Sequence, residues 1–485
     1  MGAQQDVASI LMVTPEANPF AKTGGLADVA GALGPPLRGH GSDVAVVMPR
    51  YRQVDLSRLT LVCAHLPVAL NDTTSYSTNV YSAVDQGVMY YFIDCAALYD
   101  REGLYSSAGK DYEDNYLRFA VFSLAALELT QYLQTPRILH CHDWQTALVP
   151  VYLKTRFART PALANVRTLL SVHNLGYQGL FDRRILREIG LDDSLFDSEH
   201  LEFYGKVNLL KGGLIYADRL NTVSPAYARE IQSPELGFGL DGLLRKRSRV
   251  LRGILNGVDY SQWDPRRDPH IAANYGADDL SGKAACKQAL LREFGLSDSN
   301  LTKPLIGVVS RFDSQKGFDL IEEVAADFAA VDCALVALGT GNPKYEAFFR
   351  NWAAAYPDKI GVRVGFDNSL AHQIEAGADI FLMPSRYEPC GLNQMYSLRY
   401  GTVPVVRATG GLDDAVDVST GFKFREYTGQ AMLSAVLQAV ALFREDPEGW
   451  RAMMQRGMER DFSWDQAAAQ YAGMYAELLQ PDPLA

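Results

Sequence analysis

Two cationic residues, Arg311 and Lys316, precede Gly317 in the stretch SRFDSQKG. The apolar run LIGVVS ends just before them, and an amphipathic segment begins just after them. Guanidinium and ammonium groups at the end of a strand can bind phosphate, and each charge-assisted hydrogen bond contributes about 1.5–3 kcal/mol. The pattern predicts that Arg311 and Lys316 bind an anionic ligand. Either residue taken alone is equally well explained as a surface cation in ordinary solvent.

Two further stretches, KTGGLADV and ATGGL, repeat the arrangement of an apolar run, a glycine pair and a helical pattern. A glycine pair permits a tight turn, and it also lets backbone N–H groups approach an anion. Three similar loops favour the anion site over three unrelated turns. The residues concerned are Lys22, Gly24 and Gly25 in the first stretch and Thr409, Gly410 and Gly411 in the second.

A carboxylate, Glu388, lies in the loop PSRYEPCGL between an apolar strand and a helix expected to open at Gly391. Such a group can accept hydrogen bonds from hydroxyls or stabilise a developing positive charge. The alternative is a solvated loop glutamate, which is the usual environment of glutamate. Cys390 is either a reactive thiol or, more commonly for its type, an inert buried one.

Histidines and an aspartate follow two other strands. His140 and His142 alternate in ILHCHDW, so both lie on one face of a strand at a spacing that could bind a metal, but no third ligand is evident. We expect Asp143 to cap a helix beginning at Trp144 or to bind a substrate hydroxyl. His173, with Asn174 beside it, lies at a loop mouth and is either a core imidazole or part of the site.

The chain contains no Asp-x-Asp triplet. Paired aspartates of that kind hold the metal that bridges many diphosphates, so a metal-bound diphosphate is disfavoured. Protein cations would have to neutralise a leaving phosphate instead. We therefore expect neither a metal ion nor a cofactor.

Composition limits the classes of protein that this chain can belong to. At 485 residues it is long enough for two domains, and a net charge of −11 disfavours nucleic acid or an anionic membrane as a general partner. The six cysteines form no C-x-x-C pair, as expected in a reducing compartment. The N-terminal stretch lacks the pattern of a signal peptide, and no apolar run is long enough to cross a bilayer. These features predict a cytoplasmic protein.

Short apolar runs alternate with amphipathic segments along most of the chain, which predicts an α/β fold with parallel sheets covered on both faces. Residues 60–110 interrupt this rhythm and resemble an antiparallel excursion. A seam between domains is expected near residues 253–265, and a final helix over 462–479 is expected to pack on the first domain. In such sheets ligands bind beyond the carboxyl ends of the strands, where all three glycine loops lie.

Taken together, these residues resemble the bacterial glycogen synthases and plant starch synthases, which are retaining glucosyltransferases of the GT-B fold. The resemblance is collinear over essentially the whole chain, and the order of KTGGL and EPCGL is highly specific. The motifs that carry it are KTGGLADV (22–29), HDWQ (142–145), HNLGYQG (173–179), LKGGLIYAD (210–218), LNGVD (255–259), SRFDSQKG (310–317), PSRYEPCGL (384–392) and TGGL (409–412).

The resemblance implies two Rossmann-like domains that face a deep interdomain cleft, with the C-terminal helix packing back on the first domain. Residues 1–255 with 463–485 would form the domain on the acceptor glucan side. Residues 256–462 would form the domain on the nucleotide-sugar donor side. The reaction implied is transfer of glucose from ADP-glucose to the non-reducing end of an α-1,4-glucan such as glycogen, with release of ADP.

The resemblance also implies roles for individual residues. Glu388, Arg311, Lys316 and His173 would be catalytic, with the two cations stabilising the diphosphate as it leaves. The residues implied in binding ADP-glucose are Lys22, Gly24, Gly25, Asp28, Asp143, Asn174, Asn256, Cys390, Gly391, Leu392, Thr409, Gly410 and Gly411. Four residues depart from the expected motifs: Cys141, Asn393, Asp413 and Ala415. Of these, Asp413 could weaken anion binding at the TGGL loop.

Three alternatives stay open at the level of sequence. A related transferase could use UDP-glucose or another acceptor, a nucleotide-sugar epimerase could share the fold, and a silent protein could bind glucan without turnover. Retention requires either a covalent intermediate or delivery on the face that the phosphate leaves. We favour same-face delivery, because no second carboxylate is evident opposite Glu388. Many transferases that resemble this family have another glutamate eight residues further along, and here that position is Tyr396.

Overall fold

The computed structural model describes residues 8–480, and the chain divides into two compact units. Unit 1 comprises Met1–Val223, Ile231–Ile254 and Trp464–Ala485, and unit 2 comprises Ser224–Glu230 and Leu255–Ser463. Residues 1–7, which begin the stretch predicted to lack a signal peptide, lie outside the described residues. No helix within residues 8–480 combines the length and apolar character needed to cross a bilayer.

Unit 1 is built on a nine-stranded sheet. Strands β14 to β5 are parallel, whereas β5, β4 and β3 pair antiparallel, which confirms the excursion expected for residues 60–110. The spatial order is β14 (Leu251–Gly253), β13 (Arg219–Thr222), β9 (Arg167–Val172), β8 (Ile138–His142), β1 (Ser9–Val13), β2 (Asp43–Pro49), β5 (Val88–Asp94), β4 (Ser75–Asp85) and β3 (Thr60–Ala69).

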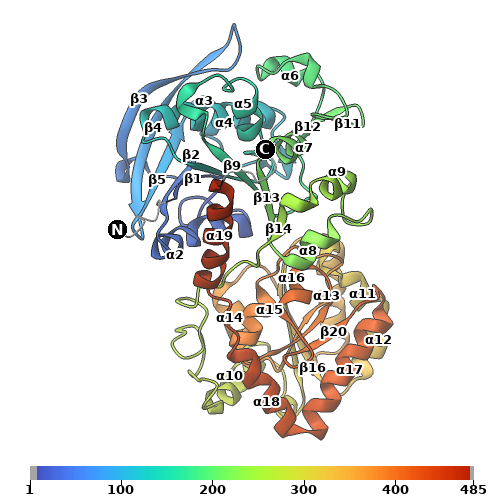
Figure 1. Ribbon diagram of the computed structural model, residues 1–485. Helices are drawn as coiled ribbons and strands as arrows, with labels where there is room; N and C mark the ends of the chain where they lie inside the picture. The colour runs from blue at the N-terminus through green and yellow to red at the C-terminus, as the bar shows by residue number, and fades with distance from the viewer. Residues whose placement is uncertain (1–7, 481–485) are drawn as a thin grey trace. The chain divides into compact units, whose positions relative to one another are not determined.

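Helices cover this sheet because its central strands are apolar on both faces and must be buried on both. The helices of unit 1 are α1 (Gly25–Ala32), α2 (Gly34–Gly39), α3 (Ala96–Tyr99), α4 (Asn115–Tyr132), α5 (Leu148–Lys154), α6 (Ile185–Glu188), α7 (Leu209–Tyr216), α9 (Asp241–Lys246) and α19 (Trp464–Leu479). Short strands form two further small sheets, β10 (Leu180–Phe181) with β12 (Lys206–Asn208) and β11 (Glu202–Phe203), and β6 (Ser106–Ser107) with β7 (Lys110–Asp111). The C-terminal helix α19 packs against α2, which confirms its expected return to the first domain (Figure 1).

Unit 2 contains a six-stranded parallel sheet. Its order is β17 (Ile360–Val364), β16 (Ala334–Gly339), β15 (Leu305–Val309), β18 (Ile380–Met383), β19 (Val403–Arg407) and β20 (Phe422–Phe424). The helices of unit 2 are α8 (Pro225–Glu230), α10 (Ser281–Glu293), α11 (Phe318–Glu323), α12 (Ala325–Ala330), α13 (Pro343–Ala355), α14 (Asn368–Gly377), α15 (Asn393–Arg399), α16 (Gly410–Ala415), α17 (Gly429–Glu445) and α18 (Pro447–Met458).

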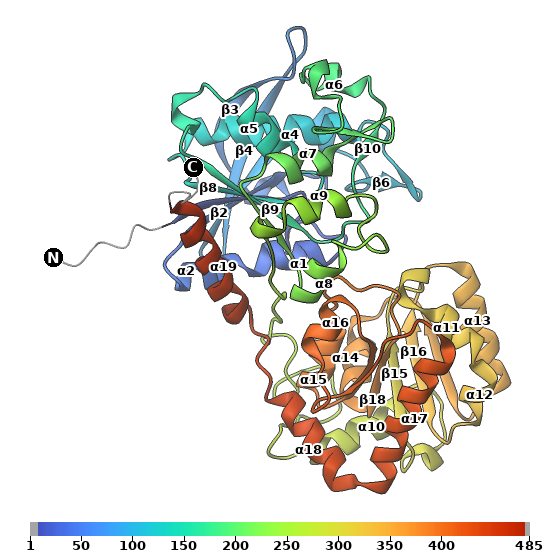
Figure 2. The same ribbon diagram turned by 45° about the vertical axis from the view of Figure 1, so that its right-hand side comes forward.

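Two apolar clusters lie on opposite faces of this second sheet. Successive side chains of β15 and β16 alternate between them, because the side chains of a strand point to opposite faces in turn. One cluster includes residues of α11, α12, α13 and α17, and the other includes residues of α10 and α14. Figure 2 shows β15 and β16 between α14 on one side and α11 to α13 on the other. The predicted class, α/β with helices on both faces of parallel sheets, is confirmed.

Three helix boundaries differ from those expected. The helix after β8 begins at Leu148 rather than at Trp144, because residues 144–147 form a turn. The helix after β18 begins at Asn393 rather than at Gly391, whose φ of 67° is left-handed. The pattern from Phe318 to Ala330 is broken into α11 and α12 at Val324, whose ψ of 20° departs from the helical value.

A fully buried polar network lies beneath β8 and β9 in unit 1. His140 Nδ1 lies 2.8 Å from the Tyr475 hydroxyl of α19, and His140 Nε2 lies 2.7 Å from Ser171 Oγ. Ser171 and Tyr471 both donate to Asn221 Oδ1. Since Ser171 has one hydroxyl hydrogen, His140 must donate from Nε2 and accept from Tyr475 at Nδ1. Burial lowers the pKa of His140 to about 3, so the ring is neutral, as this pattern requires.

Replacing Tyr475 with Phe leaves His140 Nδ1 as a buried acceptor without a donor. We expect the free energy of unfolding to fall by about 1–3 kcal/mol. The matched control is Tyr471→Phe on the same helix, which we expect to lose less because Asn221 Oδ1 still accepts from Ser171. Urea denaturation of the two variants measures the difference, and equal losses would contradict the assigned hydrogen positions.

Candidate active site

The order of the parallel strands reverses once in each sheet. In unit 1 the chain moves from β1 to β2 on one side and later places β8 on the other, and in unit 2 β15 lies between β16 and β18. In open α/β sheets ligands bind beyond the carboxyl ends of the strands at such a reversal. Lys22 and Asp143 follow β1 and β8 in unit 1, and Arg311 and Glu388 follow β15 and β18 in unit 2. Each unit therefore carries its own group of candidate residues at the expected place.

Two of the three charged residues predicted for the site in unit 2, Lys316 and Glu388, form a partly buried ion pair. Lys316 Nζ lies 2.6 Å from Glu388 Oε2, and Ser385 Oγ donates to the same oxygen over 3.0 Å. The Lys316 side chain is 19% exposed and that of Glu388 7%. Within residues 8–480 Glu388 Oε1 has no hydrogen-bond partner, so the carboxylate keeps one oxygen to accept from a ligand. The structure brings these two predicted residues together.

Arg311, the second predicted cation, is exposed at the end of the strand that leads to Lys316. Its guanidinium makes no hydrogen bond or ion pair with any residue in the described range 8–480. Since no described residue pairs with it, the Arg311 guanidinium is available to an anionic ligand, five residues before the lysine of the ion pair with Glu388.

Close backbone approach joins the loops after β15 and β18. Gly317 has a φ of 75°, and a Cβ there would lie 1.9 Å from the carbonyl oxygen of Pro384. The Arg386 N–H donates to the Gln315 carbonyl oxygen over 2.8 Å. Asn393 Nδ2 donates to the Val309 carbonyl oxygen over 3.0 Å, so this departure from the motif ties α15 to the end of β15.

The TGGL loop has a different environment from the one expected. Gly410 N and Thr409 Oγ1 donate to the Glu230 carboxylate over 2.9 and 3.2 Å, and Gly411 N donates to the Glu388 carbonyl oxygen over 3.1 Å. The donors that were expected to bind an anion are thus occupied by the protein. Thr409 and Gly410 therefore contact Glu230, and Gly411 contacts the loop of Glu388, while their binding of ADP-glucose stays a prediction.

The charge of Asp413 at this loop is also balanced by the protein. Lys423 Nζ lies 2.7 Å from Asp413 Oδ1 and also donates to the Asp413 carbonyl oxygen. The expectation that Asp413 would weaken anion binding therefore loses its basis, because a neighbouring cation neutralises it.

The remaining predicted residues of unit 2 surround Cys390. Burial raises the pKa of its thiol to about 12, with a small opposing contribution from the backbone N–H of Asn256. Such a thiol is inert, which agrees with the second of the two interpretations of Cys390, a buried and unreactive side chain. Asn256 Oδ1 is buried without a hydrogen-bond partner in the described structure. Gly391 and Leu392 lead from Cys390 into α15.

In unit 1 the predicted loop KTGGL begins with an ion pair between Lys22 and Asp28. Lys22 Nζ lies 2.7 Å from Asp28 Oδ1, with the lysine side chain 52% exposed. Thr23 donates from both N and Oγ1 to Glu16 Oε2 over 2.7 Å, which fixes the loop. A Cβ at Gly25 would meet nothing within 4 Å, and one at Gly24 only Glu16 Oε1 at 4.0 Å. Packing therefore gives no reason for these glycines, and open space lies beside them.

Asp143 contacts the strand end that carries His173. Asp143 Oδ1 accepts from His173 N over 2.6 Å, and His173 Nε2 lies 3.0 Å from His142 Nδ1. Burial raises the pKa of Asp143 to about 7, although the N–H groups of His173 and Asn174 oppose the shift. Burial also lowers the pKa of His173 to about 4, so its ring is neutral. Asp143 does not cap a helix as expected; it joins His173 and Asn174.

The two histidines of β8 lie side by side, with ring centroids 4.2 Å apart, as their spacing predicted. Their nitrogens contact Tyr475, Ser171 and His173 rather than carboxylates or thiols. No group of three His, Cys, Asp or Glu side chains that could hold a metal ion occurs in residues 8–480.

Four residues that contact the site were missed in the sequence: Glu16, Thr23, Glu230 and Ser385. Ser385 precedes Glu388 by three residues and could have been suspected from spacing alone. Glu16 and Glu230 lie seven residues or more from the groups that they bond, and no local pattern marks them.

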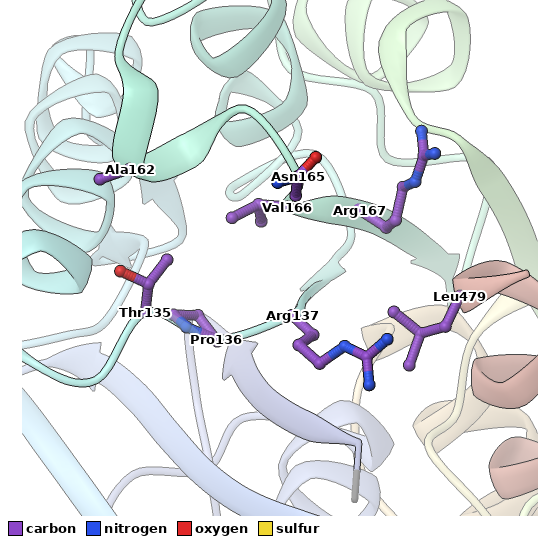
Figure 3. Close-up of a pocket in the computed structure, with 8 residues that line it drawn as sticks. All are labelled: Thr135, Pro136, Arg137, Ala162, Asn165, Val166, Arg167 and Leu479. Atoms are coloured by element: carbon purple, nitrogen blue, oxygen red, sulfur yellow. The ribbon is translucent and has the colours of Figure 1, made fainter. Parts of the chain in front are cut away.

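A pocket of about 280 Å³ lies elsewhere in unit 1. It is formed at the amino ends of β8 and β9, the edge opposite to Asp143 and His173. Figure 3 shows Arg137 and Arg167 at this pocket with their guanidinium groups pointing in different directions. They do not converge on one anion, so we assign this pocket no part in the site.

Comparison with known proteins agrees with this geometry. The family described as starch synthase catalytic domain matches residues 9–246, and that described as glycosyl transferases group 1 matches residues 293–449. The glycogen synthase of Koribacter versatilis is 49% identical over 97% of this chain and 98% of its own length. The chain belongs to the glycogen synthase and starch synthase family. The glycogen synthase of Moorella thermoacetica is also similar, with 45% identity over 97% of both chains.

Solved structures agree with the fold. The catalytic domain of starch synthase IV from Arabidopsis thaliana, bound to ADP and acarbose, has a TM-score of 0.87 and 32% identity, covering 98% of this chain and 99% of its own. Sucrose-phosphate synthase from Thermosynechococcus elongatus shares the fold alone, with a TM-score of 0.62 and 17% identity over 97% of this chain and 99% of its own. The predicted GT-B fold with two Rossmann-like domains and the predicted glycogen synthase activity are confirmed.

The raised pKa of Asp143 predicts how stability depends on pH. The Asp143 carboxyl binds its proton more tightly in the folded protein than in the unfolded chain, where an aspartate titrates near 3.8. Protonation of Asp143 therefore stabilises the fold. This contribution is fully present below about pH 4 and is lost as pH rises through about 7. Asp143→Asn removes this dependence and keeps an acceptor for His173 N. We expect the variant to gain about 1–3 kcal/mol relative to wild type between pH 4.5 and pH 8.

Denaturant titrations of both proteins at the two pH values measure this gain. Asp72→Asn, at an exposed loop position, is the control. Its difference from wild type in the free energy of unfolding should be the same at both pH values. A constant difference between Asp143→Asn and wild type would contradict the assignment.

Proposed function

We propose that this protein elongates α-1,4-glucan by transferring glucose from ADP-glucose to the non-reducing end, releasing ADP. Its family supports glucosyl transfer to a glucan, and one observation in unit 2 supports the chemistry. At the reversal of strand order, the ion pair joins Lys316 in the loop after β15 to Glu388 in the loop after β18. Arg311, which pairs with no described residue, lies in the same loop as Lys316. Such a site offers positive charge to a phosphate and a carboxylate oxygen to a sugar.

In unit 2 we assign the diphosphate to Arg311 and Lys316. Negative charge grows on the phosphate as the bond to C1 of glucose breaks, and fixed cations stabilise that charge more in the transition state than in the ground state. Glu388 would accept a hydrogen bond from a glucose hydroxyl through Oε1 and stabilise the positive charge that develops on the sugar ring. Asn256, Cys390, Gly391 and Leu392 would contact the donor around this loop.

In unit 1 we assign sugar or phosphate contacts to the loop of Lys22, Gly24, Gly25 and Asp28. The open space beside the glycines gives a ligand room to approach the backbone. Asp143, His173 and Asn174 would bind hydroxyls of the donor or acceptor glucose. With a pKa of about 7, Asp143 can act as hydrogen-bond donor or acceptor near neutral pH.

We further propose that transfer occurs on the face from which the phosphate leaves. The C1–O bond to the phosphate breaks, the acceptor O4 bonds to C1, and the O4 proton passes to the departing phosphate oxygen. Tyr396, eight residues beyond Glu388, stacks on Trp263 with centroids 3.9 Å apart and offers no nucleophilic carboxylate. A covalent glucosyl-enzyme is the alternative, and trapping of a labelled glucosyl peptide would favour it.

We propose that no metal ion is needed, because Lys316 and Arg311 supply the charge that a metal would supply. Activity unchanged by a chelator is the expected result. A cytoplasmic location fits the substrates proposed and the sequence features described above.

The donor assignment is tested by supplying ADP-glucose and UDP-glucose separately with glycogen. We expect ADP release that depends on glycogen, with kcat/KM for ADP-glucose at least about tenfold above that for UDP-glucose. Incorporation of labelled glucose into glycogen checks that release reflects transfer. Equal use of both donors would favour the broader transferase, and ADP release without glycogen would contradict elongation.

Loss of either cation should slow the chemical step. We expect Arg311→Ala and Lys316→Ala each to lower kcat by about 10²-fold, because the departing phosphate loses a charged partner. Lys316→Ala should also lower the melting temperature, since it leaves Glu388 buried without its cation, whereas Arg311→Ala should not.

Arg350→Ala, an exposed arginine on α13, is the matched control and should keep wild-type turnover. Steady-state kinetics and thermal melting separate these effects. Wild-type turnover in both Arg311→Ala and Lys316→Ala would overturn the roles given to them.

A further inference from the structure

Helix α8 belongs to unit 2, although the chain on either side of it belongs to unit 1. It packs against α16, and the two views show the helices side by side (Figures 1 and 2). Each helix receives an acidic side chain from the other. Asp414 of α16 accepts from Ser224 Oγ and Ala226 N over 2.7 and 2.8 Å, at the start of α8.

Glu230, at the end of α8, makes the reciprocal contact. Its carboxylate accepts from Gly410 N over 2.9 Å and from Thr409 Oγ1 over 3.2 Å, at the start of α16. A carboxylate suits this place, because the first N–H groups of a helix have no partner within the helix. Glu230 thus fixes the first turn of α16.

That turn is in direct contact with the loop of Glu388. Gly411 N donates to the Glu388 carbonyl oxygen over 3.1 Å. A Cβ at Gly410, whose φ is 46°, would lie 1.9 Å from the same oxygen, and one at Gly411 would lie 2.0 Å from the Cys390 carbonyl oxygen. The backbones of the two loops are therefore in contact with no room for a side chain between them.

We infer that Glu230 is a positioning residue for transfer, which holds Glu388 in place through Gly410 and Gly411. Glu230 acts through its hydrogen bond from Gly410 N and does not itself touch the substrate. This inference rests on the function proposed above and adds a residue to it.

Steady-state kinetics of Glu230→Ala with ADP-glucose and glycogen test the inference. We expect kcat to fall about 10–100-fold while KM for ADP-glucose changes less than about threefold, because a displaced Glu388 weakens the transition state more than donor binding. Glu230→Gln, whose amide oxygen still accepts from Gly410 N, should recover at least about a third of the lost activity on a logarithmic scale.

Asp414→Ala is the matched control, since it breaks the other cap of the same helix pair without touching the loop of Glu388. We expect it to lower the melting temperature while keeping kcat within about threefold of wild type. If Glu230→Ala does not fold, Glu230→Gln against Asp414→Asn carries the comparison.

Wild-type kcat in Glu230→Ala, or an equal loss of kcat in the Asp414 variant, would overturn the positioning role. Absence of glycogen-dependent ADP release from the wild-type protein would instead overturn the proposed function.

Discussion

The buried ion pair between Lys316 and Glu388 is the contact on which the candidate site of unit 2 depends. Removing two charges from water is unfavourable, and their attraction offsets this only when geometry is good and further hydrogen bonds are present. Ser385 Oγ supplies one such bond, and the loops after β15 and β18 hold the partners 2.6 Å apart. The reversal of strand order at β15 brings these loops together, so the topology of the sheet determines where this pair can form.

The glycines of the predicted loops differ in what surrounds them. At Gly317 and Gly410 the backbone is left-handed, and a Cβ would lie 1.9 Å from a carbonyl oxygen of the neighbouring loop. These glycines let three loops pack backbone to backbone beneath Glu388. At Gly25 the opposite holds, because no atom of residues 8–480 lies within 4 Å of the place that a Cβ would occupy. Glycine-rich loops of similar sequence thus serve packing in unit 2 and leave space for a ligand in unit 1.

The sequence was sufficient to predict the features that arise locally. The alternation of apolar runs predicted the parallel sheets, and the position of Lys316 and Glu388 after two such runs predicted that both lie at one sheet edge. The role of Glu230 could not be predicted, because its partners lie about 180 residues further along the chain and nothing near it is unusual. The start of α5 was misplaced for a similar reason. Asp143 bonds across to the end of β9 instead of capping the next helix.

Two carboxyl groups, Glu388 in unit 2 and Asp143 in unit 1, differ in what surrounds them. The Lys316 ammonium group and the Ser385 hydroxyl both contact Oε2 of Glu388. Burial and the nearby Glu16 carboxyl disfavour the charged form of Asp143, and the N–H groups of His173 and Asn174 favour it. A carboxyl near its own pKa can donate to one hydroxyl and accept from another. Environment, rather than residue type, therefore distinguishes these two carboxyl groups, and it is the basis of the different roles proposed for them.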